Sequence, residues 1–283
     1  MKQFNYLIIM GAFLFVFPAG AASQKVRAED VLAKHLESIG TSEARTAVSS
    51  RIAVGDGTAK FVSIKDQTVQ GRVVFASEGN KNFIGMKMNS TLYPGERFVY
   101  DGKHSSVAVV TVNSRSVLGN FVQSNSMLLE SGLLGGTLST AWPLYNLEAS
   151  KGKLSLNGTR KIDGREVYVL VYTSKKGADV DVTLYFDKET FRHVRTEYKR
   201  TSSAGIGARP EDSSRFSESR IKLVEDFSEF KTENHVTFPQ KYRINYLISG
   251  QTGTTEVEWN FVLREFAFNQ KLDPSTFEIG SEH

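Results

Sequence analysis

Two pairs of acidic residues have the spacing of a catalytic site. Asp179 and Asp181 lie two positions apart, and so do Glu256 and Glu258. In a strand, both members of such a pair point to one face, about 7 Å apart, and an acid and a base at that separation could flank a glycosidic bond. Apolar residues alternate with the acids along both segments: Val180, Val182, Val257 and Trp259. Because that alternation is typical of a strand with one wet and one dry face, we expect these carboxylates to face solvent.

The other residue types that carry chemistry lack a suitable context. The chain has five histidines: His35, His104, His193, His235 and His283. There is no His-x-x-x-His pair and no cysteine, so a metal site would need ligands from distant loops. Two Ser-x-x-Lys sequences, at 150–153 and 219–222, fall in a glycine turn and a predicted strand, whereas that nucleophile requires the start of a helix. The sequence therefore predicts no catalytic residue, metal or cofactor, and a hydrolase that uses the acidic pairs is kept only as an alternative.

The first residues have the pattern of a secretory signal peptide. Lys2 is followed by an uncharged apolar run at 6–17, then by Pro18 and small residues. This pattern predicts cleavage after Ala21 or Ala22, and the run is shorter than the ~20 residues that span a membrane. Without cysteine the mature chain has no disulfide and no site for a lipid anchor. We expect a signal peptide at 1–21 and a single domain at 22–283, soluble in the periplasm and without a transmembrane segment.

The charges of the chain are nearly balanced. Lys and Arg number 35 against 31 Asp and Glu, for a formal net charge of +4. Basic and acidic residues are mixed along the chain, as at Arg195, Glu197 and Lys199. A nucleic-acid-binding protein would concentrate its basic residues on one face. The sequence therefore predicts no nucleic-acid partner.

Hydrophobic periodicity predicts a mainly β fold with few helices. An amphipathic helix opens the mature chain, with Val31, Leu32, Leu36 and Ile39 on one side and Gly40 after its end. Short alternating segments joined by turns such as Asp101-Gly102 follow. Because strands joined by short turns pair antiparallel, about ten of them predict one curved antiparallel sheet. Residues 117–147 interrupt the strands and predict two short apolar helices that cover the sheet.

One predicted strand is apolar on both of its faces. Residues 167–172 read Val-Tyr-Val-Leu-Val-Tyr, so both faces are covered or one lines a cavity. Helices that cover a concave sheet can leave an apolar cleft for a lipid-sized ligand, and plain core packing is the alternative. The candidate lining residues are Phe83, Met86, Met88, Trp142, Leu144, Tyr168, Leu170 and Tyr172.

Several motifs of the second half resemble LolA-like exported proteins, the outer-membrane lipoprotein-sorting carriers and their relatives. The motifs follow one another in the order of that family: Asp163-Gly164-Arg165, Tyr168-Val-Leu170, Thr183-Leu-Tyr-Phe-Asp187-Lys-Glu-Thr190, Phe227-Ser-Glu-Phe-Lys231, Val236-Thr-Phe-Pro239 and Leu272-Asp-Pro-Ser-Thr-Phe277. The opening helix, with Arg51 and Gly55 after it, is also similar. The resemblance covers most of the mature chain.

The resemblance implies an open, curved antiparallel half-barrel whose concave side is plugged by helices, with acyl chains bound between the two. We therefore expect a non-catalytic carrier or binding protein for a lipid or a lipidated partner, such as a lipoprotein. The alternative is a structural or interaction protein of the cell envelope that binds a protein partner and has no lipid cavity.

Overall fold

One curved antiparallel sheet dominates the computed structural model, which describes residues 26–63, 67–109, 115–175, 179–202, 219–250 and 253–278. The sheet has 12 strands and does not close, because β5 and β6 form its two edges. The expected mainly β fold with an open, curved sheet is confirmed, with more strands than were predicted. The segment predicted as a signal peptide lies outside the described residues.

The strands divide into two meanders along the chain. The first comprises β1 (Ser50–Phe61), β2 (Gln67–Glu78), β3 (Lys81–Met88), β4 (Glu96–Tyr100) and β5 (Ser105–Val109). The second comprises β6 (Lys153–Ile162), β7 (Arg165–Thr173), β8 (Asp181–Asp187), β9 (His193–Ser202), β10 (Ser219–Glu233), β11 (Val236–Gly250) and β12 (Gly253–Phe268). The first and last strands, β1 and β12, pair antiparallel and join the two meanders into one sheet.

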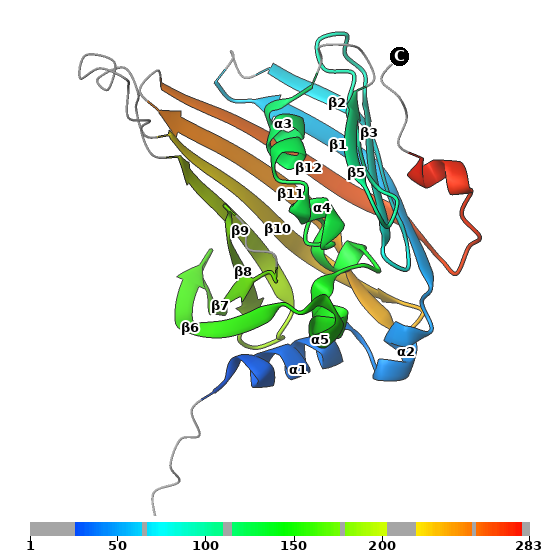
Figure 1. The fold of residues 1–283 in the computed structure, drawn as a ribbon, viewed down its shortest axis with the longest axis vertical. Helices are drawn as coiled ribbons and strands as arrows, with labels where there is room; N and C mark the ends of the chain where they lie inside the picture. The colour runs from blue at the N-terminus through cyan, green and yellow to red at the C-terminus, as the bar shows by residue number, and fades with distance from the viewer. Residues whose placement is uncertain are drawn as a thin grey trace, which may run out of the picture.

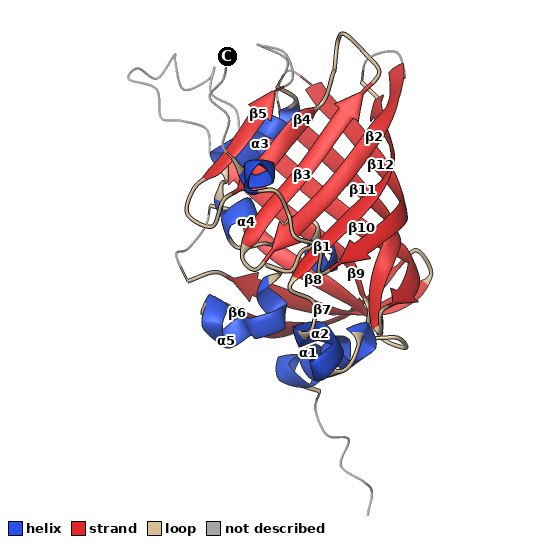
Figure 2. Ribbon diagram, turned by 90° about the vertical axis from the view of Figure 1, so that its right-hand side faces the viewer, coloured by secondary structure: helices blue, strands red, loops and turns tan. Residues whose placement is uncertain are grey.

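The strand order explains where the central helices lie. Because β5 and β6 are at opposite edges, the chain between them has to cross the sheet. We call residues 115–150 the cover. Figure 1 shows its helices lying inside the curve of the sheet. In Figure 2, the strands of the first meander are seen side by side.

The cover consists of more pieces than the two helices that were predicted. They are α3 (Val117–Ser124), α4 (Met127–Glu130), the 3-10 turns η1 (Gly136–Leu138) and η2 (Pro143–Asn146), and α5 (Leu147–Ser150). Gly132, Gly135 and Gly136 all have positive φ, at 65°, 84° and 52°, a conformation that ends a right-handed helix. These glycines make the cover a chain of short turns.

Three further helical elements lie outside the cover. They are α1 (Ala28–Ile39), α2 (Ser42–Thr46) and the 3-10 turn η3 (Pro274–Phe277). Helix α1 lies across one end of the sheet (Figure 1) and contacts β6 and β11. Its buried face includes Val31 and Ile39 as predicted, but His35 is fully buried between them while Leu32 and Leu36 are only partly covered.

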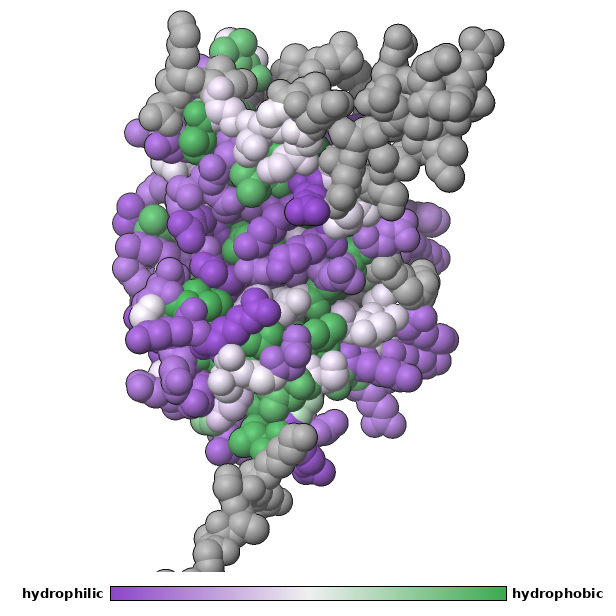
Figure 3. Space-filling model, turned by 90° about the vertical axis from the view of Figure 1, so that its left-hand side faces the viewer, coloured by the Kyte–Doolittle hydropathy of each residue, from purple (hydrophilic) through white to green (hydrophobic). Residues whose placement is uncertain are grey.

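The outer surface is mostly polar, as a sheet with one covered face requires. On the side of the molecule in Figure 3, hydrophilic residues dominate, and hydrophobic residues lie between them toward the end where α1 is found. A small second cluster of buried apolar residues, Val167, Val169 and Tyr185, is separate from the main core. The prediction that both faces of 167–172 are covered is therefore confirmed in part by this cluster, while Leu170 and Tyr172 belong to the main core.

Candidate functional site

The candidate site is the contact between the cover and the inward side chains of the sheet. The cover contributes fully buried apolar residues along its whole length: Leu118, Phe121, Val122, Leu128, Leu129, Leu133, Leu134, Leu138, Trp142 and Leu144. The sheet contributes large buried rings, among them Phe75, Phe98, Tyr242, Trp259 and Phe261. Phe75, Tyr242 and Phe261 contact one another at centroid distances of 5.6–6.0 Å. We call this ring-rich, inward side of the sheet the inner wall.

Most of the predicted lining residues belong to this region. Buried in the main core are Met86, Met88, Trp142, Leu144, Leu170 and Tyr172. Tyr168 packs at its margin and stacks on Phe191, with ring centroids 5.8 Å apart.

Phe83 lies on the opposite face of the sheet from the inner wall. Its neighbour Ile84 pairs with Phe75 and faces the core, so alternation directs Phe83 outward, opposite Ala76. There Arg97 lies over its ring at 5.6 Å. The expectation that Phe83 lines an inward cleft is wrong, because residues 83 and 84 cannot share a face.

Two small pockets adjoin the cover among the described residues. A pocket between α1 and the sheet, next to His35 and His193, has a volume of about 10 Å³. A second, at Met127, Tyr172 and Val182, has about 100 Å³. Sites for drug-sized ligands usually have ~300–1,000 Å³. Neither of these two pockets is large enough for an acyl chain.

A buried carboxylate fixes the beginning of the cover to β4. Glu96 is 0% exposed and accepts hydrogen bonds from the backbone N and the hydroxyl of Ser116, both at 2.6 Å. It also accepts one from Tyr93, whose hydroxyl in turn accepts from Trp259. Burial raises the pKa of Glu96 above its usual value. Gly119 is required here, because a Cβ at that position would lie 2.1 Å from Glu96 Oε1.

A second buried carboxylate contacts the middle of the cover. Glu225 of β10 is 0% exposed and accepts a hydrogen bond from the backbone N of Gly135 at 2.7 Å. The hydroxyls of Tyr198 and Tyr242 donate to the same carboxylate. Burial outweighs these hydrogen bonds and raises the pKa of Glu225 to about 7.

A buried guanidinium contacts the cover two residues later. Arg51 of β1 is 2% exposed and donates from Nη1 to the carbonyl oxygen of Thr137. Its guanidinium lies over the ring of Phe238 at 4.6 Å. Glu96, Glu225 and Arg51 thus form hydrogen bonds with backbone groups of the cover, which the apolar side chains of the inner wall cannot form. We call these three residues the polar anchors.

A cluster of rings lies where α1, the cover and β9 meet. Trp142 contacts both His35 and His193, each at a centroid distance of 5.1 Å. Burial lowers the pKa of His35 to about 3 and that of His193 well below its usual value, so both rings are neutral at physiological pH. His35 Nε2, His193 Nδ1 and Trp142 Nε1 have no hydrogen-bond partner among the described residues. The contacts that hold this cluster together are therefore mainly between the rings themselves.

The polar anchors were missed as site residues by the sequence analysis, although an alternation signal was present. Glu225 stands at an inward position of β10, between Leu223 and Phe227. Glu96 stands at the same phase as Phe98 on β4. A charged residue in the inward phase of a strand indicates a buried partner. Arg51 was noted only through the family resemblance.

Both acidic pairs alternate with buried apolar residues, as expected for strands with one polar face. Asp179 and Asp181 are exposed. Glu256 accepts a hydrogen bond from Asn245, and Glu258 accepts one from Asn260. Among the described residues, no group of three or more His, Cys, Asp or Glu is placed to hold a metal ion.

None of the helices in the described part of the chain has the length and apolar character needed to cross a membrane.

Comparison with known proteins finds similarity among solved structures. No protein-family model matches the chain, and no curated protein matches it. A LolA superfamily protein from Nitrosomonas europaea aligns over 89% of this chain and 98% of its own, with 16% identity and a TM-score of 0.46. A putative outer membrane lipoprotein-sorting protein domain from Vibrio parahaemolyticus aligns over 88% and 97%, with 13% identity and a TM-score of 0.44.

A third similar structure is a DUF1329 family protein from Desulfovibrio piger. It aligns over 89% of this chain and 97% of its own, with 13% identity and a TM-score of 0.39.

Proposed function

We propose that this protein is a non-catalytic binding protein of the cell envelope, which takes an acyl chain of a lipid or lipidated partner between its inner wall and its cover. The supporting observation is the construction of the cover. It is an apolar layer that continues neither meander, and three polar anchors contact its backbone. Such a layer can separate from the sheet without breaking a strand pairing.

The inner wall has the chemistry that an acyl chain requires once the cover moves. Its rings are held by a sheet whose strand pairings do not include the cover. A hydrocarbon chain that replaces the cover's leucines gains about 0.8 kcal/mol for each CH₂ group it buries. The ligand would thus compensate for the contacts that the cover gives up. Residues 1–21, as a cleaved signal peptide, would deliver the protein to the envelope.

Uptake of a fluorescent fatty acid tests this function. Delipidated protein is titrated with 11-(dansylamino)undecanoic acid, and unlabelled palmitate is used as competitor. We expect saturable binding that palmitate displaces. Binding that is absent, or that palmitate does not displace, would exclude the acyl-chain function.

A covalently fixed cover shows whether binding requires its movement. Ser77 of β2 is buried and its hydroxyl accepts from the backbone N of Thr140 in the cover at 2.9 Å. The chain has no cysteine of its own, so the double variant Ser77→Cys with Thr140→Cys contains a single pair that oxidation can join as a disulfide. We expect the joined form to lose uptake and the unjoined form of the same variant to keep it. The two single-cysteine variants, treated alike, are the controls.

The packing beside the cover supports a second candidate, an interaction protein without a lipid cavity. The pockets at His35 and at Met127 hold about 10 and 100 Å³, and the ring cluster at Trp142 is closely packed. In this case the protein would act through its outer surface on an envelope partner. It would show no displaceable fatty-acid binding whether the cover is joined to the sheet or free.

A further inference from the structure

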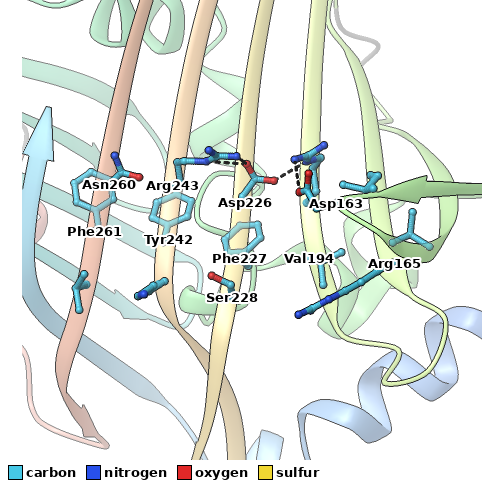
Figure 4. A pocket seen from close by; sticks show the side chains of 15 residues that line it. Asp163, Arg165, Val194, Asp226, Phe227, Ser228, Tyr242, Arg243, Asn260 and Phe261 are labelled. Atoms are coloured by element: carbon cyan, nitrogen blue, oxygen red, sulfur yellow. Dashed lines mark hydrogen bonds and ion pairs between the residues drawn. The ribbon is translucent and has the colours of Figure 1, made fainter. Parts of the chain in front are cut away.

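The outer face of the sheet carries a groove that the proposed acyl-chain function does not use. It has a volume of about 530 Å³ and crosses β9 to β12 next to the start of β7. Figure 4 shows it from outside, with polar side chains above and below and with the aromatic rings of Phe227, Tyr242 and Phe261 behind the strands. Those rings belong to the inner wall, so the groove and the acyl-chain site lie on opposite faces. We call it the outer groove.

One side of the outer groove is an internally neutralised row of charges. Strand register places Asn260, Arg243, Asp226 and Arg195 side by side across four strands. Asp226 accepts from Arg195 Nε at 2.5 Å and from Arg243 Nη2 at 2.6 Å. Arg195 and Arg243 also pair with Asp163 and Glu258, each at 3.5 Å. These cations are therefore fixed in place but largely compensated.

The other side of the outer groove carries an uncompensated cation. Arg165, at the start of β7, is exposed, and its side chain forms no hydrogen bond or ion pair with another described residue. In Figure 4 its side chain runs toward the Ser228 side of the groove. Ser228 pairs in register with Lys241, which is half exposed and forms one ion pair, to Glu229 at 2.6 Å. Arg165, Ser228 and Lys241 thus offer donors along one edge.

Aliphatic side chains lie between the polar edges. Ile162, Val167 and Val194 line the groove beside Arg165, and Val262 lines its far end. Val167 belongs to the second apolar cluster, against which Ile162 and Val194 pack. Of the four cations in the lining, Arg165 alone forms no ion pair with another described residue. A ligand that fits therefore carries negative charge next to apolar groups.

We propose that the outer groove binds an extended, acidic peptide segment of a partner protein, with Arg165 as its principal anion contact. The groove suits a peptide because apolar and cationic residues alternate along it from strand to strand. An extended peptide whose residues alternate between apolar and acidic could match that order. A flat bilayer surface cannot enter a recess between two rows of side chains. Carboxylates next to Arg165 gain charge-assisted hydrogen bonds, and the valines and isoleucine cover the peptide's apolar residues.

Fluorescence anisotropy with defined peptides tests the proposal. The probe is a short fluorescein-labelled peptide in which glutamate alternates with valine, and its partner has glutamine in place of glutamate. We expect saturable binding of the glutamate peptide that weakens with added salt, and much weaker binding of the glutamine peptide. Arg165→Gln should weaken the glutamate peptide about tenfold, the effect of one lost charge-assisted contact. Lys241→Gln should cause a smaller loss.

A control variant and a test of membrane binding complete the experiment. Arg72 of β2 is 65% exposed and lies 4.0 Å from Asp56, outside the groove lining. Arg72→Gln should leave peptide affinity unchanged. Equal binding of the two peptides, or an Arg165→Gln variant that binds like the wild type, would overturn the proposal. The proposal would also be overturned if the protein bound phosphatidylglycerol vesicles through Arg165 and did not bind the peptide. Fatty-acid uptake by Arg165→Gln should equal that of the wild type, which separates the two sites.

Discussion

Glu225 illustrates how single residues set the properties of the cover. It occupies an inward position of β10 whose sequence neighbours on that face, Leu223 and Phe227, are apolar. A buried carboxylate is costly unless hydrogen bonds compensate it, and here two tyrosine hydroxyls and the N–H of Gly135 donate to it. The pKa of about 7 shows that the compensation is incomplete. The contact between Glu225 and the cover should therefore depend on pH.

Replacing Glu225 with glutamine should change the pH dependence of stability in a defined direction. The pKa of Glu225 is about 7 in the folded protein, against 4.5 for an ordinary glutamate, so the folded state binds the proton more tightly than the unfolded state. The wild type should lose stability relative to Glu225→Gln as pH rises between these values, by about 1.4 kcal/mol for each pH unit. Urea unfolding at several pH values within that window measures the difference.

The control for this measurement is a glutamate on the same strand. Glu229 of β10 is 58% exposed and pairs with Lys241. Because an exposed ion pair contributes little to stability, Glu229→Gln should differ less from the wild type than Glu225→Gln does. If the difference between Glu225→Gln and the wild type stays constant over the same window, Glu225 is not the group that titrates.

At the scale of elements, the cover is the part of the described structure that is divided into the shortest helical pieces. Its helices are 3 to 8 residues long, shorter than helices that are stable alone. They persist because their leucines are buried and because the polar anchors satisfy their backbone groups. The strands, by contrast, are stabilised by long antiparallel ladders. Local opening should therefore concentrate in the cover.

Removal of one polar anchor should loosen the cover selectively. Arg51→Met keeps an apolar stem but loses the donor to Thr137, leaving a buried carbonyl without that partner at a cost of about 1–3 kcal/mol. We expect faster amide hydrogen exchange in residues 117–150 than in the wild type, with β10 to β12 as protected as before. Hydrogen exchange followed by mass spectrometry resolves these segments.

Arg45→Met is the matched control for Arg51→Met. Arg45 also donates to backbone carbonyl oxygens, those of Leu36 and Gly40, but at the end of α1. Its removal should speed exchange there and leave the cover unchanged. Equal effects of the two variants on residues 117–150 would show that Arg51 has no special role in fixing the cover.

At the scale of the whole molecule, one sheet carries two independent faces. The inner face is hidden under the cover, and the outer face presents the outer groove. The first and last strands pair at the centre of the sheet, so the sheet cannot form until distant parts of the chain meet. During folding, the cover, which links the two edges, should pack onto the sheet after the sheet has formed. During unfolding, it should detach before the sheet unfolds.

The two tryptophans can report this order separately. Trp142 lies in the cover and Trp259 lies in β12, and both are fully buried. In urea, the fluorescence of Trp259→Phe reports Trp142, and that of Trp142→Phe reports Trp259. We expect the Trp142 signal to change at lower urea than the Trp259 signal. Far-UV circular dichroism of each variant serves as the control for its overall stability, and coincident transitions in both variants would show that the cover and sheet unfold as one unit.

The sequence by itself determined the local structure of this protein. Alternation of apolar and polar residues is a property of neighbouring positions, so strands such as 180–186 and turns such as Asp163-Gly164, both of which have positive φ, could be predicted. The apolar interruption at 117–147 could also be located, together with its covering role. Six of the eight candidate lining residues lie in the main core.

Tertiary structure alone decided how these elements meet. The pairing of β1 with β12, the edge positions of β5 and β6 and the number of pieces in the cover depend on contacts between residues far apart in the chain. Phe83 was placed on the wrong face because an apolar side chain can pack on either side of a strand. The anchors and the outer groove needed the fold too, since each anchor joins a strand to the cover and the groove combines side chains from several strands.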